Sequence, residues 1–319
     1  MNILLKFSIY LSWILRAALC GVIILGLCLA LISLFDWTTQ GSYPVTTLPS
    51  GWAVERAVDW ESLFSRSSGW TGADGIYWIL LSGNESPGNA TNGRTLFVFS
   101  DTFIGEVNDS GERLPGSTLV HSILAGLAGD EPDPAKIILA EGRPGKYRSC
   151  ICTDTSGTKP RDWYWMMDAI SLNGKMHLFG LRMELGDGGL FNFTVAGVAL
   201  LSVPLDSPNP GLDVVQVDAP LHYAPSDGRG EIIFGAGVMV NTAEAGASVP
   251  DGYIYAYGCQ NDPFIKKLVV ARVLPEQFED FNQRRFWHGS TWSADIGDSA
   301  GLVERTSVDT LREQFYIPP

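Results

Sequence analysis

The chain has 319 residues, of which 45% are hydrophobic and 18% are charged, so it can bury a core and is not disordered. Its 22 Lys and Arg residues against 35 Asp and Glu residues give a net charge of −13. That charge would repel a nucleic acid, and no basic patch in the sequence opposes it. Aromatic residues make up 11% of the chain, a composition that favours stacking on neutral, flat partners such as sugar rings.

The N-terminal part contains one long apolar segment. Residues 17–35 carry no charge over 19 residues, which is about the length of a membrane-spanning helix. Lys6 and Arg16 precede the segment and Asp36 follows it, so the positive-inside rule places residues 1–16 in the cytoplasm. We therefore predict a single-pass type II membrane protein with a transmembrane helix at 17–35, a linker at 36–51 and an extracellular domain at 52–319. A cleaved signal, which would make the protein secreted, is the alternative.

Glycosylation and cysteine patterns bear on the same question. Four N-x-S/T sequons predict glycans on an exported chain: Asn84, Asn89, Asn108 and Asn192. Three cysteines follow the apolar segment, at 150, 152 and 259. Either Cys259 pairs with one of the other two or all three are buried thiols, and the sequence leaves both alternatives open.

Strand signals dominate after residue 50, as short alternating or β-branched runs bounded by Gly, Pro, Asn and Asp. An aromatic-rich strand recurs three times, starting at Thr95, Met176 and Tyr253, which are 81 and 77 residues apart. One further strand precedes each copy, at residues 74–83, 167–175 and 234–243. Another follows each copy, at residues 118–129, 195–205 and 266–275.

A repeated meander of three or four antiparallel strands is typical of a β-propeller blade, because one small sheet must bury its faces against neighbouring blades. We therefore predict an all-β fold, a β-propeller preceded by one transmembrane helix. A β-sandwich with accidental similarity among its hairpins is the alternative.

Several motifs occur in an order that resembles a known family. They include GWTGADGIYWILL, TLFVFSDTFIG, DWYWMMDAISLNGKMHLFG, DGYIYAYG and VVARVLPEQFEDFNQRRFW. Over about residues 52–300 the chain resembles the domain-of-unknown-function 4185 group of extracellular five-bladed propellers. That resemblance implies similarity to the glycoside hydrolase family 183 endo-D-arabinanases and to the arabinanase-like propellers of family 43. Residues 52–319 are short for five repeats of this length, so the resemblance implies shorter terminal blades or an incomplete ring.

Carboxylates occupy matching places in two of the repeats. The first strand of each blade lines the channel of a propeller, and Asp74 and Asp168 lie on these strands in repeats one and two. Glycoside hydrolysis needs two carboxyl groups that flank the scissile bond. By resemblance, Asp74 is the nucleophile or base, Asp168 is the acid or tunes its pKa, and Asp101 is a supporting carboxylate. Alternatively, Asp74 and Asp101 cap turns through backbone hydrogen bonds.

Trp70 and Trp165 lie four and three residues before these carboxylates, so we predict that they form the walls of a sugar site. Core packing is the alternative for each of them. The sequence has no His/Cys cluster with metal-ligand spacing, so we predict no metal site, and a Ca²⁺ ion follows only by analogy with other propeller channels.

These patterns predict an extracellular glycoside hydrolase whose partner is a polysaccharide or oligosaccharide of furanoside or cell-wall type. The alternative is a non-catalytic carbohydrate-binding or surface-interaction propeller, or a truncated copy of one. Substituting Asn at both Asp74 and Asp168 would distinguish a hydrolase from a binder.

Overall fold

The computed structural model describes residues 55–86, 93–129, 131–140, 151–186, 192–206, 213–262 and 266–305. The chain divides into two compact units, Met1–Arg56 and Ala57–Pro319, and every element named below belongs to the second. The predicted segments at 1–16, 17–35 and 36–51 lie outside the described residues. Within those residues, no helix has the length and apolar character that a membrane span needs.

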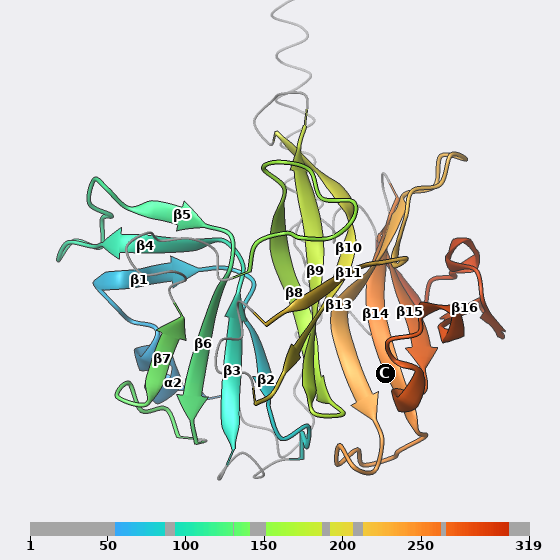
Figure 1. Ribbon diagram of the computed structural model, residues 1–319, viewed down its shortest axis with the longest axis horizontal. Coiled ribbons are helices and arrows are strands. Elements are labelled where there is room, and N and C mark those ends of the chain that lie inside the picture. The colour runs from blue at the N-terminus through green and yellow to red at the C-terminus, as the bar shows by residue number, and fades with distance from the viewer. Residues whose placement is uncertain are drawn as a thin grey trace, which may run out of the picture. The chain divides into compact units, whose positions relative to one another are not determined.

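Four antiparallel sheets make up the described part of the second unit (Figure 1). The first sheet contains β1 (Ser68–Ala73), β4 (Thr102–Glu106) and β5 (Thr118–Val120). The second contains β2 (Tyr77–Leu80), β3 (Arg94–Phe99), β6 (Ile123–Ala128) and β7 (Ile137–Ala140). The third contains β8 (Trp163–Leu172), β9 (Lys175–Leu185), β10 (Phe193–Pro204) and β11 (Val215–Ala219).

The fourth sheet is the largest. Its strands are β12 (His222–Tyr223), β13 (Glu231–Asn241), β14 (Tyr253–Asn261), β15 (Lys266–Val273), β16 (Arg285–Trp287) and β17 (Trp292–Ser293), and β18 (Val303–Arg305) pairs with β15. The helical elements are short: α2 (Val58–Leu63) and the 3-10 turns η1 (Pro275–Gln277), η2 (Phe281–Gln283) and η3 (Ile296–Asp298). The all-β prediction is therefore confirmed for the described residues.

The repeat predicted from the sequence corresponds to the second, third and fourth sheets. Its three strands per unit are β2-β3-β6, β8-β9-β10 and β13-β14-β15, and a further antiparallel strand, β7, β11 or β16, follows in each sheet. The first strand β8 contacts both β2 and β13, as the inner strands of adjacent propeller blades do. The described residues thus show a propeller-like stack of three four-stranded units, and no closed ring of five is present among them.

Three hydrophobic clusters hold the sheets together. They lie between the first and second sheets together with α2, between the second and third, and between the third and fourth. Their central members are Leu63, Phe99 and Ile123 in the first cluster, Val98, Leu178 and Leu201 in the second, and Phe179, Phe234 and Ile254 in the third. Alternate residues of each strand enter these clusters because successive side chains point to opposite faces of a sheet.

In repeat one, two strands predicted to be continuous are interrupted. Residues 95–103 divide into β3 and β4, and residues 118–129 divide into β5 and β6. In the first sheet β4 pairs with β1 and with β5, whereas in the second sheet β3 pairs with β2 and with β6. The prediction of one strand in each segment was wrong because the chain bends from one sheet into another without a Gly or Pro to mark the bend.

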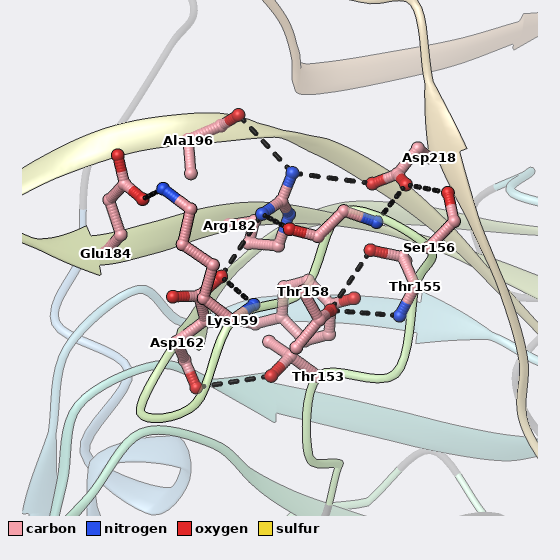
Figure 2. Close-up of polar contacts among 12 residues, drawn as sticks. Thr153, Thr155, Ser156, Thr158, Lys159, Asp162, Arg182, Glu184, Ala196 and Asp218 are labelled. Atoms are coloured by element: carbon pink, nitrogen blue, oxygen red, sulfur yellow. Dashed lines mark hydrogen bonds and ion pairs between the residues drawn. The ribbon is translucent and has the colours of Figure 1, made fainter.

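The loop that precedes β8 is fixed by a partly buried polar network (Figure 2). The Arg182 guanidinium on β9 donates to the Gly157 carbonyl at 2.7 Å and to Asp162 Oδ2 at 3.1 Å. Asp218 on β11 accepts from the Gly157 amide at 2.9 Å and from Ser156 Oγ at 2.8 Å. These bonds tie residues 156–162 to two strands of the third sheet and so define where β8 begins.

Two of the three cysteines after the apolar segment can be placed. Cys152 is exposed and Cys259 is partly buried, and no disulfide joins these two residues. The alternative of three buried thiols does not hold for Cys152. Cys150 lies outside the described residues.

Candidate functional site

The candidate site forms where three strands of the first repeat are interrupted at the same level. β1 gives way to β2 at residues 74–76, β3 to β4 at 100–101, and β5 to β6 at 121–122. Each interruption carries a polar side chain, namely Asp74, Asp101 and His121. The predicted candidates Asp74 and Asp101 are thus brought together, and His121 joins them.

Asp74 and Asp101 are joined through their backbones. The Asp74 amide donates to the Asp101 carbonyl at 3.1 Å, and the Asp101 amide donates to Asp74 Oδ1 at 3.0 Å. Gly75 has φ +58, and a Cβ there would lie 2.7 Å from Ser100 Oγ, so the chain needs glycine at this position. The Asp74 side chain therefore binds a backbone amide from a different strand interruption rather than one in its own turn, and the residue is exposed to solvent.

His121 faces Asp101 from the neighbouring strand. Its Nδ1 lies 2.8 Å from Asp101 Oδ1, and the two side chains are 37% and 25% exposed. The imidazole stacks on the Trp163 ring with centroids 4.9 Å apart and planes 25° apart. The ring is thus held between a carboxylate and an indole while part of it stays open to water.

Asp168 lies in a bulge of β8, where the pairing with β9 shifts between Met166 and Ala169. Its Oδ1 accepts from the Ala169 amide at 2.8 Å, and its Oδ2 accepts from the Val238 amide of β13 at 2.7 Å. The carboxylate therefore links the inner strands of the third and fourth sheets. Each oxygen retains a further lone pair, so these bonds leave room for another donor.

Electrostatic effects show that Asp74 and Asp168 share one neighbourhood. Burial, followed by the charges of Asp168 and Asp74, raises the pKa of the Tyr77 hydroxyl on β2. Burial, followed by the charge of Asp101, raises the pKa of Asp74. Burial also raises the pKa of Asp168 against the lowering effect of its two amide donors. Two carboxyl groups with raised pKa values therefore act electrostatically on the Tyr77 hydroxyl.

A third carboxyl group approaches from the loop after β2. Burial, followed by the charge of Asp168, raises the pKa of Glu85 even though this residue remains in contact with solvent. The Glu85 amide donates to the Ala245 carbonyl at 2.9 Å, so the loop is fixed against residues that follow β13. Glu85 and His121 were missed from the sequence because neither belongs to a recognisable local motif. Tyr77 was missed although it lies in the GWTGADGIYWILL motif, because nothing in that motif marks its hydroxyl as a site group.

The two predicted tryptophan walls differ in the structure. Trp165 is half-buried on β8, and its ring meets the Phe193 ring edge-on at 4.9 Å. Trp70 is only 4% exposed and packs against Phe64 and Phe99 at 5.7 and 5.3 Å. Trp70 is therefore a core residue with no face open to a ligand, and the alternative of core packing holds for it.

Three sequons lie among the described residues. Asn84 is half-buried and accepts from the Ser86 amide at 3.0 Å, whereas Asn192 is exposed just before β10. Asn108 donates to Glu112 Oε2 at 3.0 Å within an exposed turn. Asn89 lies outside the described residues, and glycosylation at all four sites remains a prediction.

Among the described residues, no group of three or more His, Cys, Asp or Glu side chains is arranged to hold a metal ion. The carboxyl groups and the imidazole at the bend offer hydrogen-bonding and acid–base chemistry in a partly exposed site. Such an arrangement can transfer protons to or from a bound molecule.

The fold and the site define an all-β protein of antiparallel sheets with carboxyl groups at a strand bend. The chain belongs to the family described as Domain of unknown function (DUF5005), whose model matches residues 58–317. This is a different family from the 4185 group that the motifs resemble, so the comparison does not support the predicted family name or its glycoside hydrolase relatives.

No curated protein matches the chain. One similar solved structure is a crystal structure of a "putative hydrolase" from Bacteroides ovatus ATCC 8483, with 16% sequence identity and a TM-score of 0.52. The alignment covers 75% of this chain and 58% of that one. The chain thus spans little more than half of that protein's length, and the likeness shows a shared fold.

Proposed function

We propose that this protein is a carbohydrate-active hydrolase that cleaves glycosidic bonds through Asp74 and Asp168. The observation that carries the proposal is the electrostatic environment of Tyr77, whose pKa is raised by burial and then by the charges of both carboxylates. Two carboxyl groups near one hydroxyl, each with a raised pKa, suit a reaction that needs one protonated and one ionised carboxyl group.

The environments of the two carboxyl groups suggest their roles. Asp74 is exposed and lies at the bend, where it can act as nucleophile or base. Asp168 is anchored by two backbone amides, and it is the acid or the group that tunes it. Asp101 supports Asp74 through the backbone hydrogen bond at 3.0 Å. Trp165, together with Trp163, would offer ring surfaces to a sugar.

The finer features of this proposal rest on the sequence. They are a five-bladed propeller, a furanoside-type or cell-wall polysaccharide as substrate, and similarity to the arabinanase-like propellers. The extracellular location, through a type II anchor at residues 17–35 or as a secreted protein, belongs to the same proposal. The fold shared with a protein named as a hydrolase is compatible with it.

A second candidate function is carbohydrate binding without catalysis. Both Asp168 oxygens accept backbone amides, which is the arrangement expected of a structural carboxylate. The corresponding strand of the fourth sheet carries Ala236 and Gly237 where the other repeats have an acid. A binding protein would keep the aromatic surface of Trp165 and would need neither carboxylate.

The test uses the full chain against a panel of polysaccharides that includes arabinans, with release of reducing ends and binding measured in parallel. We expect Asp74→Asn and Asp168→Asn to lower turnover by about 10²–10⁴-fold while affinity stays within about tenfold. Asp109→Asn, on an exposed turn, is the matched control and should behave as the wild type. Binding by the wild type without any turnover would support the second candidate, and unchanged turnover in both variants would refute the assigned carboxylates.

A further inference from the structure

One chain of contacts connects His121 to Asp74. His121 Nδ1 lies 2.8 Å from Asp101 Oδ1, and the Asp101 amide donates to Asp74 Oδ1 at 3.0 Å. Asp101 thus uses its side chain toward His121 and its backbone toward Asp74. The three residues come from three different strand interruptions, so their meeting is a property of the bend and not of a local sequence motif.

The contacts of His121 serve its orientation. Stacking on Trp163 at 4.9 Å fixes the plane of the imidazole, and the Asp101 carboxylate fixes which nitrogen faces it. A neutral imidazole with its proton on Nδ1 donates one hydrogen bond to the carboxylate. An imidazolium adds a positive charge that offsets the negative charge of Asp101.

We propose that His121 is a positioning residue of the candidate site: it holds the Asp101 carboxylate and sets the charge that Asp74 faces. This inference rests on the proposed function for its catalytic meaning. Its physical content, an electrostatic coupling between His121 and Asp74, can be measured without a substrate.

The other charged and titratable neighbours of this site come from each element around the bend. Tyr77 on β2 and Asp168 on β8 are electrostatic neighbours of the site, because the charges of both Asp74 and Asp168 act on the Tyr77 hydroxyl. Arg113 lies over the Phe103 ring of β4 at 3.9 Å, on the side of the first sheet. Glu85 approaches Asp168 from the loop after β2.

The coupling has a definite sign. The negative charge of Asp101 raises the pKa of Asp74, second only to the effect of burial. The His121 imidazole faces the Asp101 carboxylate that exerts this effect, so removing the imidazole should raise the pKa of Asp74 further. The Coulombic interaction between two charges in a partly solvated site amounts to about half a pKa unit.

The experiment follows the Asp74 carboxyl carbon by ¹³C NMR through an acid titration of the full chain. His121→Phe keeps a ring for Trp163 but removes the donor and the charge, whereas His121→Asn keeps a donor near the Nδ1 position without the charge. We expect both variants to raise the pKa of Asp74 by about half a unit, with the larger rise in His121→Phe. Asp101→Asn should lower the pKa of Asp74. His222→Gln, the same type of loss on the distant strand β12, is the matched control and should leave Asp74 unchanged.

The inference is overturned if Asp74 titrates in folded His121→Phe and His121→Asn as it does in the wild type. If His121→Phe does not fold, His121→Asn alone decides. A shifted Asp74 titration in a protein that cleaves no polysaccharide would support the coupling while refuting the proposed function. Normal polysaccharide cleavage with an unshifted Asp74 titration would refute the coupling while supporting the proposed function.

Discussion

Replacing Arg182 with Met should destabilise the protein severely, because it leaves a buried carboxylate without its positive partner. Arg182 binds the Gly157 carbonyl at 2.7 Å, Asp162 Oδ2 at 3.1 Å and the Ala196 carbonyl at 3.4 Å (Figure 2). It also lies 3.6 Å from Asp218 Oδ1. The Arg182 and Asp162 side chains are only 9% and 3% exposed, so water cannot replace the lost contacts. Removing one partner of a buried ion pair costs about 3–5 kcal/mol, and we expect a loss in this range.

Urea unfolding of the variant and the wild type measures this loss as a shift of the midpoint at constant slope. Lys159→Met is the matched control, because the Lys159 amide binds Asp162 Oδ2 at 2.9 Å but its side chain points to Glu184 and is 67% exposed. That variant should unfold as the wild type does. Adding Asp162→Asn to Arg182→Met should recover part of the loss, since the unpaired charge is then absent. Equal midpoints for Arg182→Met and Lys159→Met would refute the argument.

Two further predictions concern a buried histidine and a buried glycine. Burial lowers the pKa of His177 to about 4, so the unfolded chain binds more protons between that value and the usual pKa near 6.5. The free energy of unfolding should therefore fall by about 3 kcal/mol as the pH drops from 6.5 to 4. The variant His177→Asn should lack this pH dependence. His288→Asn, at an exposed site, is the control and should keep it. Gly235 has φ +110 and a Cβ there would lie 2.9 Å from Phe179 Cγ, so Gly235→Ala should cost about 2–4 kcal/mol in urea unfolding. Gly111 has φ +80, and a Cβ there would meet no atom within 4 Å, so Gly111→Ala should cost only about 1 kcal/mol. Equal losses of stability in the two variants would contradict the clash with Phe179.

The meander repeat could be predicted from the sequence because each strand carries its own alternating pattern and its own turn residues. The hairpin between β8 and β9 is an example, since Asn173 and Gly174 both adopt positive φ, at 52° and 74°. The break between β3 and β4 could not be predicted in this way. The segment from Thr95 to Phe103 is uniformly suited to a strand, and it bends because its two halves pair with different sheets.

The candidate site was predictable only in part for the same reason. Asp74 and Asp101 were found because they occur in motifs, and the structure brings them within hydrogen-bonding distance at 3.0 Å. His121 lies 20 residues from Asp101 in an apolar strand segment, so only the pairing of β5 and β6 with their neighbours reveals the contact. Trp70 shows the opposite error, because closeness to Asp74 in the sequence said nothing about which face of β1 its side chain occupies.

The bend itself explains why polar residues gather there. An interrupted ladder releases backbone amides and carbonyls that need other partners. Ser100 Oγ donates to the Met166 carbonyl at 3.0 Å, and Ser122 Oγ donates to the Ile151 carbonyl at 3.3 Å. Ser100 and Ser122 are 4% and 1% exposed. Ser100 directly precedes Asp101 and Ser122 directly follows His121, and both of these site residues are partly exposed. At each interruption the serine side chain thus points inward and binds a carbonyl in the third sheet or in the segment that leads to it. The neighbouring side chain points outward to the site. The same bonds that hold the sheets together at the bend therefore also orient the side chains on which the proposed chemistry depends.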